Sequence, residues 1–345
     1  MKLRFFIIII LAFINVVLFA QDNAVIVPDS TLRMAYSIKN ITALSITNIY
    51  GDIAYEGTSG DSIIVEVTIK LENPEEEFAE IYDMINIKSA ITKKTLELKT
   101  VFSNSFSSSN TFSVSYKIKG TEDLTLFVNN QFGNIVINES GNVDATINHG
   151  NITISKPFDK LKLNLKNGYA KLPKVEIVNA TIANSQLAIT ETANMEINAE
   201  FSNVNIGKAG TVKIQCNTGE LSFSEVDDIS VTGNLCFLKI DSLHETGYFE
   251  MENGSLSVNN ILQTVNNFSA SLTKTPVNLS MSSSMLYALH GEISNGNLHH
   301  PQMEKIRLLV ENGITSFSGL IGNDKSNETT TSVIIFSEGA DIIFN

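Results

Sequence analysis

Apolar residues alternate with polar ones in short runs that recur along most of the chain. Each repeat has three apolar residues at every second position, a short polar turn, and two more apolar residues at every second position. Equivalent positions lie 17 to 18 residues apart over the most regular stretch. A period of two predicts β-strands rather than amphipathic helices. The six regular triplets are Val143/Ala145/Ile147, Leu161/Leu163/Leu165, Val178/Ala180/Ile182, Met195/Ile197/Ala199, Val212/Ile214/Cys216 and Ile229/Val231/Gly233.

The same pattern continues on both sides of this stretch at wider steps, which brings the total to about thirteen copies. A repeat this short cannot bury its apolar face alone, but stacked copies bury a continuous column and pair their strands in parallel. We therefore predict an all-β protein, a right-handed parallel β-helix (β-solenoid) of about 13 coils. The right hand is taken from its prevalence among such folds. The further copies begin, in chain order, at Leu44, Leu124, Gly247, Phe268, Leu289, Ile306 and Val333, and the last of these closes the series.

Asn and Gly recur in the turn between the triplet and the pair. Examples lie at residues 148–151, 166–168 and 252–254. Both residue types tolerate a positive φ, which tight corners often require. The turns therefore let the chain make the same corner in every copy.

A long insertion separates the first two copies. It contains an alternating strand at residues 61–70 and then Asn73-Pro74 followed by three glutamates. Asn is favoured at the helix N-cap, Pro at the first helical position and acidic residues in the first turn, so a helix is predicted here. Further strands are expected near residues 96–101 and 112–118. We expect this α/β insertion to cover the open N-terminal end of the column.

The first twenty residues have the pattern of a secretory signal peptide. Lys2 and Arg4 precede an apolar block at residues 5–19, and Ala20 stands at the expected cleavage site. The protein is thus predicted to be exported to the periplasm or the cell surface, with no membrane association after cleavage. The predicted domains are a signal peptide (1–20), a first coil plus helix-containing N-terminal cap (21–123) and a β-solenoid (124–345).

Charge narrows the range of partners. The chain of 345 residues has 24 Lys and Arg against 37 Asp and Glu, a formal net charge of −13. This balance argues against nucleic acid and anionic membrane surfaces. A glycan or an envelope protein is the expected partner, and the sequence predicts no oligomeric state.

Several motifs together resemble one protein family. Residues 44–53 (LSITNIYGDI), the strand GDSIIVEV at 60–67, the Pro74 helix and the recurring Asn-x-Gly-x-Ile turns are similar to the bacterial putative-adhesin β-helix family of the head GIN-domain type, common in Bacteroidetes. The resemblance covers nearly the whole chain after residue 20. It implies an exported β-helix without an established activity and a recurring aromatic-Gly turn, found here at Tyr50-Gly51 and Phe132-Gly133.

The outward-facing positions offer few catalytic groups. Parallel β-helix enzymes that act on polysaccharides gather carboxylates on one outer face. No outward row of this chain places two carboxylates on adjacent coils. Instead Asp144 faces Lys162 and Glu196 faces Lys213, as stabilising cross-strand pairs. We therefore expect no catalytic residues and no cofactor.

The histidines and cysteines do not indicate a metal site or a bridge. Adjacent strand residues point to opposite faces, so His299 and His300 are not expected to bind one metal. The frame places Cys216 in the buried column and Cys236 in the turn of the next coil. Export permits a disulfide, but a bridge needs Cα atoms within about 7 Å. We expect two free thiols, with a bridge as the alternative.

Longer loops and several ring side chains distinguish residues 243–300. Tyr248, Tyr287, His290 and His299 are predicted to be exposed or nearly so, and rings on rigid strands stack on sugars at little entropic cost. These four residues form the predicted glycan- or protein-contact surface. The simpler interpretation is that Tyr248 and His290 fill one cross-strand row.

The predicted function is that of a non-enzymatic, adhesin-like binding protein of the cell envelope. Two alternatives stay open at this point. One is a carbohydrate-active β-helix enzyme with its site in the loops after Val258. The other is a structural envelope protein without a ligand.

Overall fold

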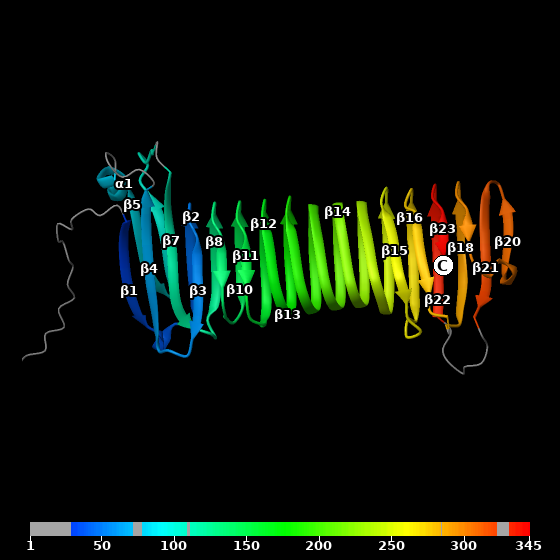
Figure 1. Ribbon diagram of the computed structural model, residues 1–345, viewed down its shortest axis with the longest axis horizontal. Coiled ribbons are helices and arrows are strands. Elements are labelled where there is room, and N and C mark those ends of the chain that lie inside the picture. The colour runs from blue at the N-terminus through cyan, green and yellow to red at the C-terminus, as the bar shows by residue number, and fades with distance from the viewer. Residues whose placement is uncertain (1–28, 72–77, 109–110, 284, 323–330) are drawn as a thin grey trace, which may run out of the picture.

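The protein is an elongated stack of β-strands. The computed structural model describes residues 29–71, 78–108, 111–283, 285–322 and 331–345. Figure 1 shows the strands side by side along one long axis, so the molecule is a rod. The predicted signal peptide and the predicted helix start at Asn73-Pro74 lie outside the described residues.

The elements are almost all strands, with one short α-helix and two 3-10 helices (η). The N-terminal elements are β1 (Asp29–Ser37), η1 (Ile38–Asn40), β2 (Ala43–Ile49), β3 (Ile53–Thr58), β4 (Ser62–Leu71), α1 (Phe78–Met84), β5 (Ile85–Thr92), β6 (Thr95–Phe102) and β7 (Phe112–Thr121). The central strands are β8 (Thr125–Gln131), β9 (Ile135–Ile137), β10 (Val143–Asn148), β11 (Ile152–Ile154), β12 (Phe158–Lys166), β13 (Tyr169–Ala183), β14 (Gln186–Glu252) and β15 (Ser255–Ile261). The C-terminal elements are β16 (Asn267–Thr273), β17 (Val277–Met281), β18 (Tyr287–Ser294), β19 (Leu298–His299), η2 (Met303–Lys305), β20 (Ile306–Glu311), β21 (Ile314–Ile321), β22 (Thr331–Glu338) and β23 (Ile342–Phe344).

The predicted triplets pair in parallel in the predicted register. Leu163 of β12 lies between Ala145 of β10 and Ala180 of β13. Leu163 is buried, with 2% of its surface exposed, and the next residue, Asn164, is exposed. Alternate residues therefore form a continuous apolar column inside and a polar face outside. This confirms that these segments are strands and that the predicted residues point inward.

The strands form two ladders that run along the rod. Ladder A has the order β5-β6-β2-β8-β10-β12-β13-β14-β16-β22-β18-β21-β20. Ladder B has the order β1-β4-β7-β3-β9-β11-β13-β14-β15-β17-β23-β19. The long strands β13 and β14 contribute to both. Side chains that point between the ladders make the core.

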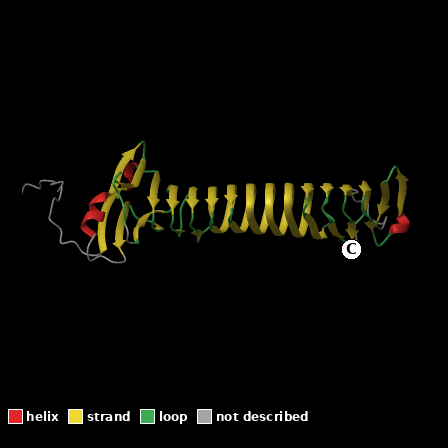
Figure 2. Cartoon of the chain, turned by 90° about the horizontal axis from the view of Figure 1, so that it is seen from above, coloured by secondary structure: helices red, strands yellow, loops and turns green. Residues whose placement is uncertain are grey.

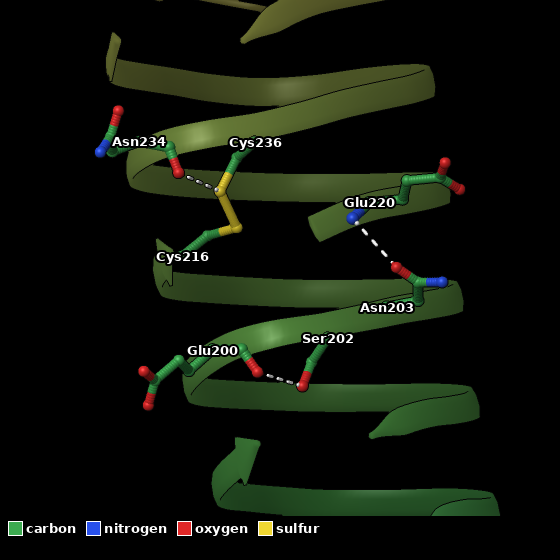
Figure 3. Close-up of a disulfide and its surroundings, with 7 residues drawn as sticks. All are labelled: Glu200, Ser202, Asn203, Cys216, Glu220, Asn234 and Cys236. Atoms are coloured by element: carbon green, nitrogen blue, oxygen red, sulfur yellow. Dashed lines mark hydrogen bonds between the residues drawn. A yellow bond between two sulfur atoms is a disulfide. The ribbon is translucent and has the colours of Figure 1, made fainter. Parts of the chain in front are cut away.

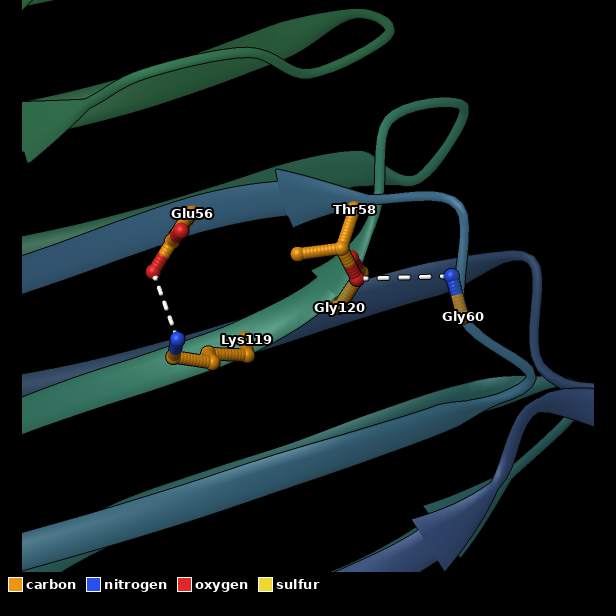
Figure 4. A network of polar contacts seen from close by, with 5 residues as sticks. All are labelled: Glu56, Thr58, Gly60, Lys119 and Gly120. Carbon is orange, nitrogen blue, oxygen red and sulfur yellow. Dashed lines mark hydrogen bonds and ion pairs between the residues drawn. The ribbon is translucent and has the colours of Figure 1, made fainter.

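The insertion adds antiparallel strands at the N-terminal end of the rod. β4 lies between β1 and β7, and β5 pairs with β6. Figure 4 shows the polar contacts that join β3 to β7: Lys119 lies 3.1 Å from Glu56, the Thr58 hydroxyl donates to the Gly120 carbonyl at 3.0 Å, and the Gly60 N–H donates to Thr58 at 3.4 Å. Ladder B thus begins at β1 and ladder A at β5.

The C-terminal order differs from the prediction. We expected the Ile306 copy to follow the Leu289 copy in parallel and the Val333 copy to close the series. Instead β22, which carries Val333, lies between β16 and β18, and β20 and β21 form an antiparallel hairpin at the end of ladder A. Parallel strands of one pattern fit beside one another in several orders, because each offers the same edge and the same apolar face.

The corner glycines are needed for close packing rather than for a positive φ. At residues 167 and 168 it is Asn167 that has the positive φ, 55°. A Cβ on Gly168 would lie 1.9 Å from the Gly150 carbonyl oxygen of the preceding corner. The Asn prediction is therefore confirmed, whereas Gly occurs there because successive corners nearly touch.

Candidate functional site

The four ring residues predicted as a contact surface do not lie together. Tyr248 and His290 share one row of ladder A, but Ser269 and Ile334 separate them because β22 is inserted. The Tyr248 ring is 46% exposed, and its hydroxyl accepts a hydrogen bond from Asn267 Nδ2 at 2.9 Å. His299 is exposed on ladder B. Tyr248 and His290 thus share an outer face, and His299 belongs to the other ladder.

Tyr287 is buried, which corrects its assignment to the surface. Only 4% of it is exposed, since its ring lies against Phe344 with a centroid distance of 6.4 Å. Its hydroxyl lies 2.6 Å from His300 Nε2. Burial raises the pKa of the Tyr287 hydroxyl above its ordinary value. Tyr287 therefore anchors the C-terminal end of the core and does not face a ligand.

His300 is held as a neutral ring in this cluster. Its Nδ1 accepts a hydrogen bond from the Gln302 backbone N–H at 2.8 Å, which places the ring proton on Nε2, next to Tyr287. Desolvation lowers the pKa of His300, and the charge of Glu304 opposes this shift. His299 is exposed while His300 contacts the core, so the two rings point apart as expected.

Cys216 and Cys236 form a disulfide, which corrects the expectation of free thiols (Figure 3). Their Cα atoms are 6.3 Å apart. Gly233 is the position of the next repeat that matches Cys216, and a Cβ there would lie 3.2 Å from the Cys236 Cβ. The glycine thus leaves the space that the bridge crosses. Glycine at an inward position, one repeat after a cysteine, was the signal in the sequence.

An open groove of about 680 Å³ crosses the outer face of ladder A at residues 181–252. Two outward rows line it, and each advances by 17 or 18 residues from strand to strand. One row is Thr181, Asn198, Gln215, Thr232 and Glu250, and the other is Ala183, Glu200, Asn217, Asn234 and Glu252.

The groove lining is rich in amides and carries no basic side chain. Asn198, Gln215 and Asn217 are exposed. Their side chains make no hydrogen bond with any other described residue, whereas the Asn234 Oδ1 accepts one from Asn253 Nδ2 at 3.1 Å. Three carboxylates make the groove acidic. The arrangement can therefore donate and accept hydrogen bonds with hydroxyl groups, and it repels anions.

Exposed apolar side chains stand at the corner beside the groove. Phe201 directly follows Glu200 and is 56% exposed, and Leu235 directly follows Asn234. Among the described residues, the Phe201 ring makes no contact with another aromatic ring. Phe201 therefore has ring surface available for stacking.

The aromatic-Gly turns nearer the N-terminus are different. Tyr50 stacks on Phe132 at 5.3 Å between centroids, and Phe132 stacks on His149 at 5.0 Å. These rings cover one another's faces and present their edges. The aromatic-Gly turns at Tyr50-Gly51 and Phe132-Gly133 thus stack their rings on one another at this end of the rod.

Several acidic residues elsewhere on the rod are paired with lysines. Lys162 lies 3.1 Å from Asp144 and Lys213 lies 3.3 Å from Glu196, as the sequence predicts, and Lys174 lies 2.9 Å from Glu191. Such exposed pairs stabilise neighbouring strands only slightly, because water screens the attraction between the charges. No group of three or more potential metal ligands occurs in the described part of the chain.

The sequence analysis treated every outward row as a polar sheet face without catalytic groups, and the row that begins at Thr181 was one of these. In the sequence this row is indistinguishable from any other neutral polar face, because the sequence does not show whether an Asn or Gln side chain has a hydrogen-bond partner. Only the structure separates Asn234 from Gln215 in this respect. Tyr248 lies on the same strand face as Glu250, so one of the predicted contact residues borders the groove.

Comparisons with known proteins give matches in structure only. No family model matches the chain, and no curated protein matches it. A solved structure described as a putative adhesin from Parabacteroides merdae is 11% identical, with a TM-score of 0.37, and the match covers 91% of this chain and 96% of that one. A putative adhesin from Parabacteroides distasonis is 11% identical, with a TM-score of 0.33 and coverage of 92% and 97%. A putative cell adhesion protein from Clostridium sporogenes is 10% identical, with a TM-score of 0.21 and coverage of 92% and 98%.

Among the described residues, no helix is both long and apolar enough to cross a membrane.

Proposed function

We propose that the chain is an exported, non-enzymatic, adhesin-like binding protein of the cell envelope. The apolar segment at residues 5–19 supports export through a signal peptide at 1–20. The repeat of 17 to 18 residues supports a β-helix, with the residues before Leu124 as an N-terminal cap, and its right hand is taken from the prevalence of that hand among such folds. In this proposal the rigid rod holds a ligand surface away from the site of attachment.

The groove on ladder A is the ligand site, and its ligand is a neutral polysaccharide. The observation that carries this proposal is the row of free amides at Asn198, Gln215 and Asn217. The groove crosses five strands at about 4.8 Å each, a length of about 20 Å. Sugar hydroxyls suit amide donors and acceptors, and the exposed ring of Phe201 at one edge offers a stacking surface.

The alternative of a carbohydrate-active enzyme rests on two carboxylates in the same groove. Glu250 and Glu252 are both outward residues of β14 and line the groove together. Glycosidases use a pair of carboxyl groups that flank the bond to be cleaved. Release of reducing ends from a polysaccharide bound at the groove would favour this alternative over the binding role.

Binding is tested by titrating the purified protein with neutral and acidic oligosaccharides. We expect affinity for neutral chains only. Asn198→Ala and Gln215→Ala should each weaken it by about 2- to 10-fold, because each removes one hydrogen-bonding group. Phe201→Ala should weaken it by removing a stacking surface.

Matched control variants lie on ladder B. Asn205 is an exposed amide there, and Phe237 is 53% exposed, close to the value for Phe201. Asn205→Ala and Phe237→Ala should leave the affinity unchanged. Equal losses in both sets, or binding of acidic oligosaccharides alone, would show that the groove is not the site.

A further inference from the structure

The C-terminal end of the rod finishes in an apolar edge strand. Within the described part of the chain, β20 pairs with β21 and with no other strand (Figures 1 and 2). Its residues Leu308, Leu309 and Val310 are 45%, 51% and 67% exposed. Free edges of sheets are usually charged, short or covered, because another strand pairs with them readily. An apolar free edge therefore indicates a surface that a partner covers.

The hairpin geometry determines which backbone groups of β20 are available. Asn312 and Gly313 form a two-residue turn with φ values of 51° and 80°, between the paired residues Glu311 and Ile314. In such hairpins the two residues that flank the turn are hydrogen-bonded to each other, and bonded and non-bonded pairs then alternate along the strands. The outward-directed groups of β20 follow from this alternation.

Only two central residues of β20 direct their backbone N–H and C=O away from β21. These are Leu308 and Val310, whereas the corresponding groups of Leu309 face β21. A second copy of β20, running antiparallel, can hydrogen-bond to the backbone groups of both residues. In that register, Val310 of the second copy lies opposite Leu308 of the first, and Leu308 of the second lies opposite Val310 of the first. This register places Leu309 opposite Leu309 of the other strand.

We propose that a second copy of the chain pairs with this edge, β20 against β20, about a two-fold axis at Leu309. Arg307 of each copy then faces Glu311 of the other, at non-hydrogen-bonded positions where opposing side chains approach most closely. Two ion pairs flank an apolar centre, so the segment Arg-Leu-Leu-Val-Glu is complementary to itself in reverse. The two-fold axis closes the assembly as a dimer rather than a fibre.

In this dimer, side chains on both faces of β20 contact side chains of the second copy. Leu308 is opposite the buried Phe317 of β21, so it lies on the core side of the sheet, and Val310 lies on the same side two residues on. Across the junction, Leu308 and Val310 of the two copies cover one another and continue the core. On the outer side, Leu309 contacts its counterpart. The dimer therefore covers all three exposed apolar residues.

Sedimentation velocity of the purified protein tests the dimer through its charge pairs. The unaltered protein is expected to dimerise, and Arg307→Glu or Glu311→Arg alone should weaken dimerisation by about tenfold or more, since each turns two attractions into repulsions. The double variant Arg307→Glu/Glu311→Arg should recover it. A mixture of the two single variants should form a heterodimer, because their charges are again complementary.

Arg33→Glu is the matched control, because Arg33 is an exposed arginine on β1 at the other end of the rod. This change should leave the dimer intact. All variants should melt in a cooperative transition, which shows that they are folded. A protein that stays monomeric, that forms open fibres, that loses the dimer on Arg33→Glu, or whose single variants fail to recombine would overturn the proposal.

Discussion

At the scale of single residues, the size of each buried side chain in the column limits the size of the side chains at the matching positions of the neighbouring strands. Leu163 packs between Ala145 and Ala180, so one large side chain fills the space left by a small side chain on either side. At Gly233 the column has no side chain, and the bridge of Cys216 crosses that space. The alternation was predictable from the sequence. The bridge was not predicted, because its two cysteines occupy different positions of neighbouring repeats, and the inward Gly233 was its one signal in the sequence.

Leu163→Asp tests the facing of the column. The change buries a carboxylate without a partner, so we expect the free energy of unfolding to fall by about 3 kcal/mol or more. Asn164→Asp, one residue further on the exposed face, should change it by less than about 0.5 kcal/mol. Denaturant unfolding followed by circular dichroism measures both. Similar losses for the two variants would contradict the observed facing.

His300 makes stability depend on pH in a defined direction. Desolvation lowers the pKa of the folded-state imidazole, so the unfolded chain takes up the proton first as the pH falls below about 6.5. The contribution of the neutral ring is therefore present above this pH and is lost as the pH falls through the lower folded-state pKa. We expect the melting temperature to drop between pH 7.5 and pH 5, and to drop less in His300→Gln.

The control for this pH effect is the neighbouring histidine. His299→Gln removes an exposed ring that does not contact Tyr287. It should keep the pH dependence of the unaltered protein. If His299→Gln and His300→Gln flatten the curve equally, the buried cluster is not its source.

At the scale of elements, the pattern predicted the strands but not all of their neighbours. Periodicity identifies the apolar face of the strand that carries Val333, but it does not determine which strands lie on either side of it. The sequence order suggested a place after the Ile306 copy, whereas β22 lies between β16 and β18. The antiparallel hairpin of β20 and β21 takes the end position instead, because its two-residue turn returns the chain beside itself.

Cysteine pairs test this strand order. Ser271 of β16 pairs with Phe336 of β22, which in turn pairs with Glu292 of β18. Ser271→Cys with Phe336→Cys should cross-link on oxidation, since adjacent strands are about 4.8 Å apart. Ser271→Cys with Glu292→Cys should not, because two strand spacings, about 9.6 Å, exceed the reach of a disulfide. Peptide mapping by mass spectrometry identifies the link, and the opposite outcome would support the order expected from the sequence.

At the scale of the whole molecule, the rod offers a rigid surface on which side chains repeat at the spacing of strands. Some outward rows carry paired charges, such as Lys174 with Glu191. The groove on ladder A differs because its amides at Asn198 and Gln215 are free and its lining has no basic residue. The composition of this face was visible in the sequence. Its concavity and the absence of hydrogen-bond partners for these amides among the described residues were not, since both depend on how successive strands are set against one another.

The central claim is that a neutral polysaccharide binds along the ladder A groove. The most direct measurement follows the side-chain amide resonances of isotope-labelled protein during titration with a soluble neutral oligosaccharide. The account predicts that the resonances of Asn198, Gln215 and Asn217 shift together with one affinity, while that of Asn205 on ladder B does not move. Shifts at Asn205 with none in the groove would contradict it.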